Sequence, residues 1–79
     1  MSITASRKYT FNARLFASML RARRGEMSLR QVEDFAGVSP STLSRAENGK
    51  TPDVITFATL CGWLGEEPAQ FFIVPMEQK

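Results

Sequence analysis

Hydrophobic residues recur along the chain at the spacing of amphipathic helices. The pattern predicts a first helix that begins with Thr10 as its N-cap and ends near Arg24. A second helix is predicted from Ser28, because Gln31 lies three residues further on and completes a capping box for two backbone amides. It ends at Gly37, since glycine adopts the left-handed conformation of a helix end without steric cost.

Three more helices are expected, at residues 39–48, 53–64 and 66–74. Pro40 suits the first helical position, where its fixed φ helps and its missing N–H does no harm. Asp53 suits the start of the next helix, because a negative charge there interacts well with the helix dipole. No segment shows the sustained alternation of a strand, so the predicted fold class is all-α, with five short helices.

The connection between the second and third helices is the most informative feature. Gly37-Val38-Ser39 is too short to let the two helices pack along their full lengths. It favours the steep crossing of a helix-turn-helix, whose second helix enters the major groove of DNA. The positions that would fix this crossing hold Val32, Ala36, Gly37, Val38 and Leu43. A generic helical hairpin can share this pattern, so the spacing by itself leaves both interpretations open.

Charge is distributed unevenly along the chain. Residues 1–30 carry seven basic side chains and one acidic one, whereas residues 31–79 carry three basic and seven acidic ones. A basic half is the electrostatic pattern of a nucleic-acid binder, but a solvated, charged helix face would explain it equally well.

The string GVSPSTLSRAENGKTP at residues 37–52 resembles the centre of the lambda-repressor-like, Cro-type (XRE family) helix-turn-helix proteins. MSLRQVEDFA is similar to their second helix, PDVITFATLCGWLG to their fourth and EEPAQFF to their fifth. The resemblance covers roughly residues 11–73 and implies a five-helix bundle that binds operator DNA as a dimer. Two positions depart from it: Leu29 stands where the family often has a phosphate-binding Gln, and Glu33 where a small residue is usual.

The resemblance assigns base contacts to the third helix. Arg45 is the strongest candidate, because a guanidinium can bond guanine O6 and N7 together. A pairing with Glu33 or with a phosphate is the alternative role for Arg45, and helix initiation is the alternative for Pro40. The expected base-contacting residues are Pro40, Ser41, Thr42, Ser44 and Arg45.

Phosphate contacts are expected at the start of the second helix and after the third. The residues are Ser28, Arg30, Asn48, Gly49, Lys50 and Thr51. Such contacts fix the register of the protein on DNA without reading its sequence. By resemblance, Glu47 is an inward-facing acid that pairs with an arginine of the first helix, for which Arg21 is the expected partner.

The composition of the chain argues against an enzyme and against a protein that binds a metal, a cofactor or a small molecule. The 79 residues suffice for one domain and contain one cysteine and no histidine, so we expect no disulfide, metal, cofactor or small-molecule site and no enzyme. We expect a cytoplasmic protein, because no signal peptide or membrane-spanning stretch is evident. The predicted organisation is a flexible arm at 1–9, the DNA-binding domain at 10–74 and a tail at 75–79.

The C-terminal end of the predicted domain is unusually apolar. Phe71, Phe72, Ile73 and Val74 either close the core or form a contact of a homodimer. The leading hypothesis is a transcriptional regulator, a repressor that binds a palindromic operator as a dimer. The alternative is a protein-interaction module, such as the antitoxin of a toxin–antitoxin pair.

Overall fold

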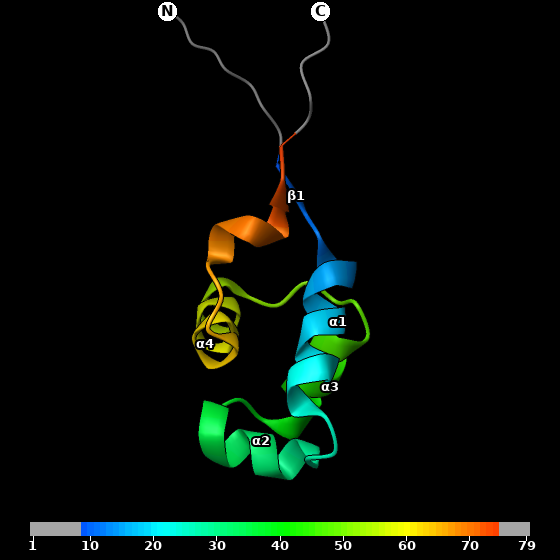
Figure 1. Ribbon diagram of the computed structural model, residues 1–79, viewed down its shortest axis with the longest axis vertical. Coiled ribbons are helices and arrows are strands. Elements are labelled where there is room, and N and C mark those ends of the chain that lie inside the picture. The colour runs from blue at the N-terminus through cyan, green and yellow to red at the C-terminus, as the bar shows by residue number, and fades with distance from the viewer. Residues whose placement is uncertain (1–8, 75–79) are drawn as a thin grey trace, which may run out of the picture.

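Four α-helices and one turn of 3₁₀-helix form the body of the protein in residues 9–74, the part that the computed structural model describes (Figure 1). The elements are β1 (Thr10–Phe11), α1 (Ala13–Arg24), α2 (Leu29–Ala36), α3 (Pro40–Glu47), α4 (Val54–Leu64), the 3₁₀ turn η1 (Pro68–Phe71) and β2 (Phe72–Ile73). Residues 1–8 and 75–79, where we predict most of the arm and all of the tail, lie outside the described residues.

The helix starts predicted from capping residues are confirmed for α2, α3 and α4. In α2, the Ser28 amide donates to Gln31 Oε1 at 2.8 Å, and the Gln31 amide donates to Ser28 Oγ at 3.1 Å. Ser39 caps α3 with a proline at the first position, and Asp53 caps α4 by accepting from the Thr56 amide at 2.8 Å. These contacts span three residues, so the local sequence determines them.

The start of α1 differs from the prediction. Asn12, not Thr10, is the N-cap, and its Oδ1 accepts a hydrogen bond of 3.0 Å from the Leu15 amide. Thr10 instead belongs to β1, which pairs antiparallel with β2 in the register Thr10↔Ile73. A backbone held in this ladder is extended, so the helix can begin only after it.

The predicted fifth helix is wrong. The segment forms only the turn η1, and the chain is already extended at Phe72, with φ −111° and ψ 134°. Phe71 is fully buried and the next residues pair with β1, so burial and strand pairing override the local helical pattern. Over residues 9–74 the fold is therefore a helix-turn-helix with four α-helices and a short ribbon formed by β1 and β2.

Aromatic side chains dominate the core on the ribbon side. Phe16 and Phe71 meet edge to face with ring centroids 4.9 Å apart, and Phe57 lies 5.1 Å from Phe16. Phe11 of β1 also packs edge to face on Phe57, at 5.3 Å. Such pairs contribute beyond their buried area, and here they fasten both ends of the described chain to α1 and α4.

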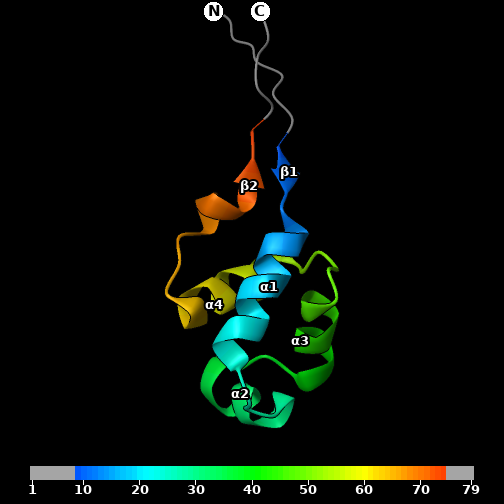
Figure 2. The same ribbon diagram turned by 45° about the vertical axis from the view of Figure 1, so that its right-hand side comes forward.

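The ribbon and α2 lie at opposite ends of the molecule, with α3 along one side of the body (Figures 1 and 2). The core continues towards α2 through Leu20, Val32, Leu43 and Leu60, each with no exposed surface. Within residues 9–74, no helix has the length and apolar character needed to cross a membrane.

Candidate nucleic-acid interface

The two faces of α3 have different environments. Leu43, Ala46 and Glu47 are buried against the rest of the body, whereas Ser41 and Arg45 are exposed. Gly37 adopts φ 77° in the turn between α2 and α3, the left-handed geometry that lets α2 end and the chain change direction. The turn therefore buries one side of α3 and leaves the other to solvent.

The exposed side gathers the residues predicted to read bases. We call this surface the α3 outer face; it consists of Pro40, Ser41, Thr42, Ser44 and Arg45, each exposed or half-buried. The Arg45 guanidinium makes one long contact, 3.4 Å, to Thr42 Oγ1. No ion pair joins it to Glu33 within residues 9–74, so most of its N–H donors remain available to a ligand.

The loop after α3 holds the predicted phosphate contacts, and it uses several of its own amides. The amides of Asn48, Gly49 and Lys50 donate to carbonyls in the last turn of α3, at 3.0 to 3.1 Å. Gly49 adopts φ 88°, which allows the chain to fold back in this way. The donors at these residues that no intrachain hydrogen bond within residues 9–74 uses are therefore the side chains of Asn48, Lys50 and Thr51 and the amide of Thr51.

At the start of α2, Ser28 and Arg30 are both exposed but are not equally available. The capping box engages both the amide and the hydroxyl of Ser28, as described above. No intrachain hydrogen bond or ion pair engages the Arg30 side chain within residues 9–74. Of the two residues, Arg30 thus keeps its side-chain donors free for a ligand, whereas Ser28 does not.

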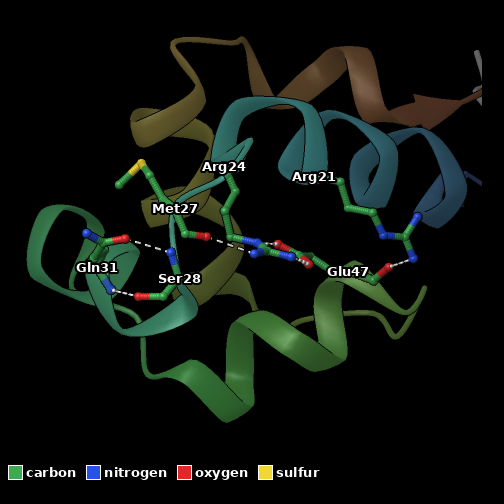
Figure 3. A network of polar contacts seen from close by, with 6 residues as sticks. All are labelled: Arg21, Arg24, Met27, Ser28, Gln31 and Glu47. Carbon is green, nitrogen blue, oxygen red and sulfur yellow. Dashed lines mark hydrogen bonds and ion pairs between the residues drawn. The ribbon is translucent and has the colours of Figure 1, made fainter.

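Glu47 anchors the inner face of α3 to α1 (Figure 3). Its carboxylate accepts two hydrogen bonds from Arg24, at 2.7 Å from Nε and 2.8 Å from Nη2. Arg24 Nη1 also donates to the Met27 carbonyl at 2.9 Å, just before α2. One guanidinium therefore joins the end of α1, the start of α2 and the end of α3.

The arginine predicted to pair with Glu47 is the wrong one. Arg21 donates a hydrogen bond to the backbone carbonyl of Glu47. The side-chain carboxylate of Glu47 accepts its hydrogen bonds from Arg24 instead (Figure 3). The reason is geometric: Arg21 and Arg24 lie on the same side of α1, and the carboxylate points towards the end of α1. Hydrogen bonding to Glu47 raises the pKa of Arg24 above its ordinary value, burial opposes this rise, and Coulomb attraction adds to it.

A groove that we did not predict from the sequence runs between α1 and the end of α3. Arg14 and Arg21 line this groove. They are seven residues, or about two helical turns, apart and lie on an exposed side of α1. The full lining is Ala13, Arg14, Ala17, Arg21, Glu47, Asn48 and Gly49. Helical spacing of the arginines in the basic half was the signal available in the sequence.

Arg23 of the same helix serves a different contact. It donates to the Trp63 carbonyl at 3.3 Å, and its guanidinium lies 5.4 Å from the centre of the Trp63 ring. This is a cation–π geometry, and it ties α1 to α4. The basic side chains of α1 are therefore divided between structural contacts and the groove beside α3.

Comparison with protein families settles what kind of domain this is. The profile of the helix-turn-helix domain family matches residues 15–71, which is well over half of the chain. The chain belongs to the helix-turn-helix domain family. This family is Cro/XRE-like, as the resemblance in residues 37–52 predicts, and membership indicates DNA binding. Comparisons with curated proteins and with solved structures found no match.

Proposed function

We propose that this helix-turn-helix protein is a sequence-specific transcriptional regulator, a repressor that occupies a palindromic operator as a dimer. The observation that carries the proposal is the contrast between the two faces of α3. Its inner face is fixed by Leu43 and by the bidentate bond between Glu47 and Arg24. Its outer face presents polar side chains and one arginine whose donors are largely unused.

In this proposal the α3 outer face enters the major groove. Arg45 bonds the O6 and N7 atoms of one guanine, and Ser41 and Ser44 bond neighbouring base edges. Pro40 and the methyl group of Thr42 contact a thymine methyl. Each of these contacts depends on a base, so together they distinguish an operator from other DNA.

Phosphates on either side of the groove hold the domain in register. Arg30 binds one strand beside the start of α2, and Asn48, Lys50 and the Thr51 amide bind the other beside the end of α3. The amides of Ser28 and Gly49 already donate hydrogen bonds within the chain. These two residues therefore let the DNA backbone come close to the protein but offer it few free donors. This arrangement supports a function in binding DNA.

The test is a salt-titrated binding assay with the DNA immediately upstream of the protein's own gene and with a shuffled duplex of equal length. A specific regulator binds the upstream DNA about a thousandfold or more tightly than the shuffled duplex at physiological salt. Equal affinity for both duplexes at every salt concentration overturns the proposal, because phosphate contacts alone give only salt-sensitive, non-specific binding.

Two substitutions separate base reading from phosphate anchoring. Arg45→Ala is expected to lose about 1–3 kcal/mol of discrimination at one base pair. Lys50→Ala is expected to weaken binding to all sequences alike and to reduce the salt slope by about one unit. If Arg45→Ala weakens every sequence equally, Arg45 is a phosphate contact and the assignment of base reading to it is wrong.

A partner-binding role, such as that of an antitoxin, is the second candidate function. It is favoured by one observation: apolar side chains of the ribbon, among them Phe72 and Ile73, are exposed in the single chain. An interaction module would cover them with a different protein, and a dimeric regulator would cover them with its own copy.

A further inference from the structure

The groove between α1 and the end of α3 carries positive charge that its own lining does not balance. Arg14 and Arg21 stand on its α1 side, and both are exposed. Glu47 is the acidic residue of the lining, and its carboxylate already accepts two hydrogen bonds from Arg24, which is not part of the lining. The lining that residues 9–74 provide therefore has no carboxylate left for the two groove arginines.

The two groove arginines converge although their charges repel. Arg21 donates to the main-chain carbonyl of Glu47, so its guanidinium is held in place. Figure 3 shows Glu47 between two guanidinium groups, that of Arg24 near the end of α1 and that of Arg21 towards its start. Arg14 lies on that start, about 10 Å from Arg21 along the helix axis. A cleft lined by charge of one sign concentrates ions of the opposite sign, so this groove attracts an anion.

The groove also has room and hydrogen-bond donors for such an anion. Apart from the arginines, α1 contributes only the small side chains of Ala13 and Ala17, and the hollow measures about 430 Å³. No hydrogen bond or ion pair engages the Arg14 side chain within residues 9–74. The planar fork of a guanidinium matches the oxygens of a phosphate, so a phosphate is the anion that these donors fit best.

The position of the groove indicates where the phosphate comes from. Its wall opposite the arginines is formed by Asn48 and Gly49, which belong to the loop that holds the phosphate contacts of the proposed function. A DNA strand bound by Asn48 and Lys50 would thus pass the open side of the groove. The phosphate after those that the loop holds can then reach Arg14 and Arg21.

We propose that Arg14 and Arg21 bind a phosphate of the DNA backbone, next along the strand from those held by the loop after α3. The inference rests on the proposed function, and it extends the DNA interface from the helix-turn-helix onto α1. A phosphate contact carries no sequence information, so this site strengthens binding to operator and to other DNA alike. Free inorganic phosphate shares the chemistry of the site, and the experiments distinguish the two sources.

The first experiment measures the salt dependence of DNA binding for two arginines of α1. Each phosphate that a protein neutralises contributes about 0.9 to the slope of log affinity against log salt concentration. Arg14→Ala is expected to reduce the slope by about one unit. Between about 50 and 200 mM salt, the wild type should thus lose about three- to fourfold more affinity than this variant.

Arg23→Ala is the matched control, because it removes the same charge from the same helix. Arg23 is nine residues, or about two and a half turns, beyond Arg14 and packs on Trp63 on the opposite side of α1. It is expected to leave the slope unchanged, and circular dichroism and thermal unfolding establish that both variants fold. Equal reductions in both variants overturn the proposal, since they would reflect net charge and not a contact.

A conservative substitution separates charge from packing. Arg14→Lys keeps a positive charge that can bind a phosphate, so its slope is expected to stay close to that of the wild type. A slope that falls as far in Arg14→Lys as in Arg14→Ala overturns the proposal, because the loss would then not follow the charge.

The second experiment locates the phosphate on the DNA. In a set of duplexes, one backbone phosphate at a time is replaced by a neutral methylphosphonate. One position is expected to weaken binding of the wild type but not of Arg14→Ala, and it should lie next to the position to which Lys50→Ala is insensitive. Equal sensitivity of the wild type and Arg14→Ala at every position overturns the proposal. So does binding of inorganic phosphate, seen as a shift of the Arg14 side-chain resonance, if the DNA slope of Arg14→Ala equals that of the wild type.

The outcomes distinguish this inference from the proposed function, since the slope is measured on the upstream DNA and on the shuffled duplex. Tight binding to the upstream DNA with an unchanged slope in Arg14→Ala supports the regulator and contradicts the site on α1. Equal affinity of the wild type for both duplexes, with the slope reduced in Arg14→Ala alone, supports the site on α1 and contradicts the regulator.

Discussion

Two regions of this small protein hold its helices together by opposite kinds of contact. At the junction of α1 and α3, one arginine and one carboxylate meet in a bidentate bond, with Arg24 and Glu47 atoms 2.7 and 2.8 Å apart. On the ribbon side, a cluster of phenylalanines packs with ring centroids about 5 to 6 Å apart. We call these the polar junction and the aromatic cluster.

The difference separates positioning from stability. A bidentate bond is directional, so the polar junction fixes the angle of α3 relative to α1. Aromatic packing buries large apolar side chains and is less directional than a bidentate ion pair, so we expect the aromatic cluster to contribute more to the free energy of folding than the polar junction does. Substitutions in the two regions should therefore change different properties.

The largest expected effect is in the aromatic cluster. Phe71→Ala removes a fully buried ring that contacts Phe16 and Phe57, and should lower the free energy of unfolding by about 3–5 kcal/mol in urea denaturation. Phe35→Ala is the control, because Phe35 is 74% exposed and its loss should change the value by less than about 0.5 kcal/mol. Equal losses for the two variants would contradict the assignment of Phe71 to the core.

The same cluster shows where prediction from sequence ends. The starts of α2, α3 and α4 were predictable because a cap and its amide are three residues apart. The ribbon was not, since Thr10 and Ile73 pair across almost the whole chain and two residues give no readable alternation. The helical pattern after Pro68 can be recognised from neighbouring residues. The burial of Phe71, which overrides that pattern, depends on Phe16 and Phe57, which are distant in the sequence.

The next largest effect is expected at the polar junction. Arg24→Ala leaves the buried Glu47 carboxylate without its partner and should cost about 2 kcal/mol, because Arg24 itself is 26% exposed and partly screened. Arg21→Ala removes only a bond to a main-chain carbonyl and should cost about 1 kcal/mol or less. Urea denaturation of each variant at neutral pH measures both values.

A double substitution sharpens this comparison. Adding Glu47→Ala to Arg24→Ala removes the unpaired carboxylate, so the double variant should be more stable than Arg24→Ala alone. Operator affinity should nevertheless stay reduced in the double variant, because α3 has lost its anchor. Full recovery of affinity would show that the polar junction does not position α3.

Residues around the polar junction also show what the sequence could indicate about the site. The family resemblance predicts that Glu47 faces inward and that Arg45 is exposed, and the structure has Glu47 buried and Arg45 exposed. The choice between Arg21 and Arg24 depends on how far α1 reaches beside α3, which sequence spacing alone does not determine. The amides around Gly49 are likewise used by α3 through a loop geometry that no sequence pattern specifies.

The smallest effect is expected at Asp53, which belongs to neither region and caps α4. Hydrogen bonds from Thr56 lower the pKa of the Asp53 carboxyl below its ordinary 3.8, while partial desolvation opposes this. The ionised cap therefore stabilises the fold fully above the unfolded pKa, and this contribution is lost as the pH falls through the lower, folded pKa.

Asp53→Asn keeps an oxygen acceptor for the Thr56 amide but cannot ionise. The wild type should thus have the higher melting temperature at about pH 7, and the difference should shrink or vanish near about pH 2. The two proteins differ only at residue 53, so the difference between them reports that side chain alone. A difference that is constant between these pH values would mean that the charge of Asp53 contributes nothing, and that its cap acts only through the geometry of the hydrogen bond.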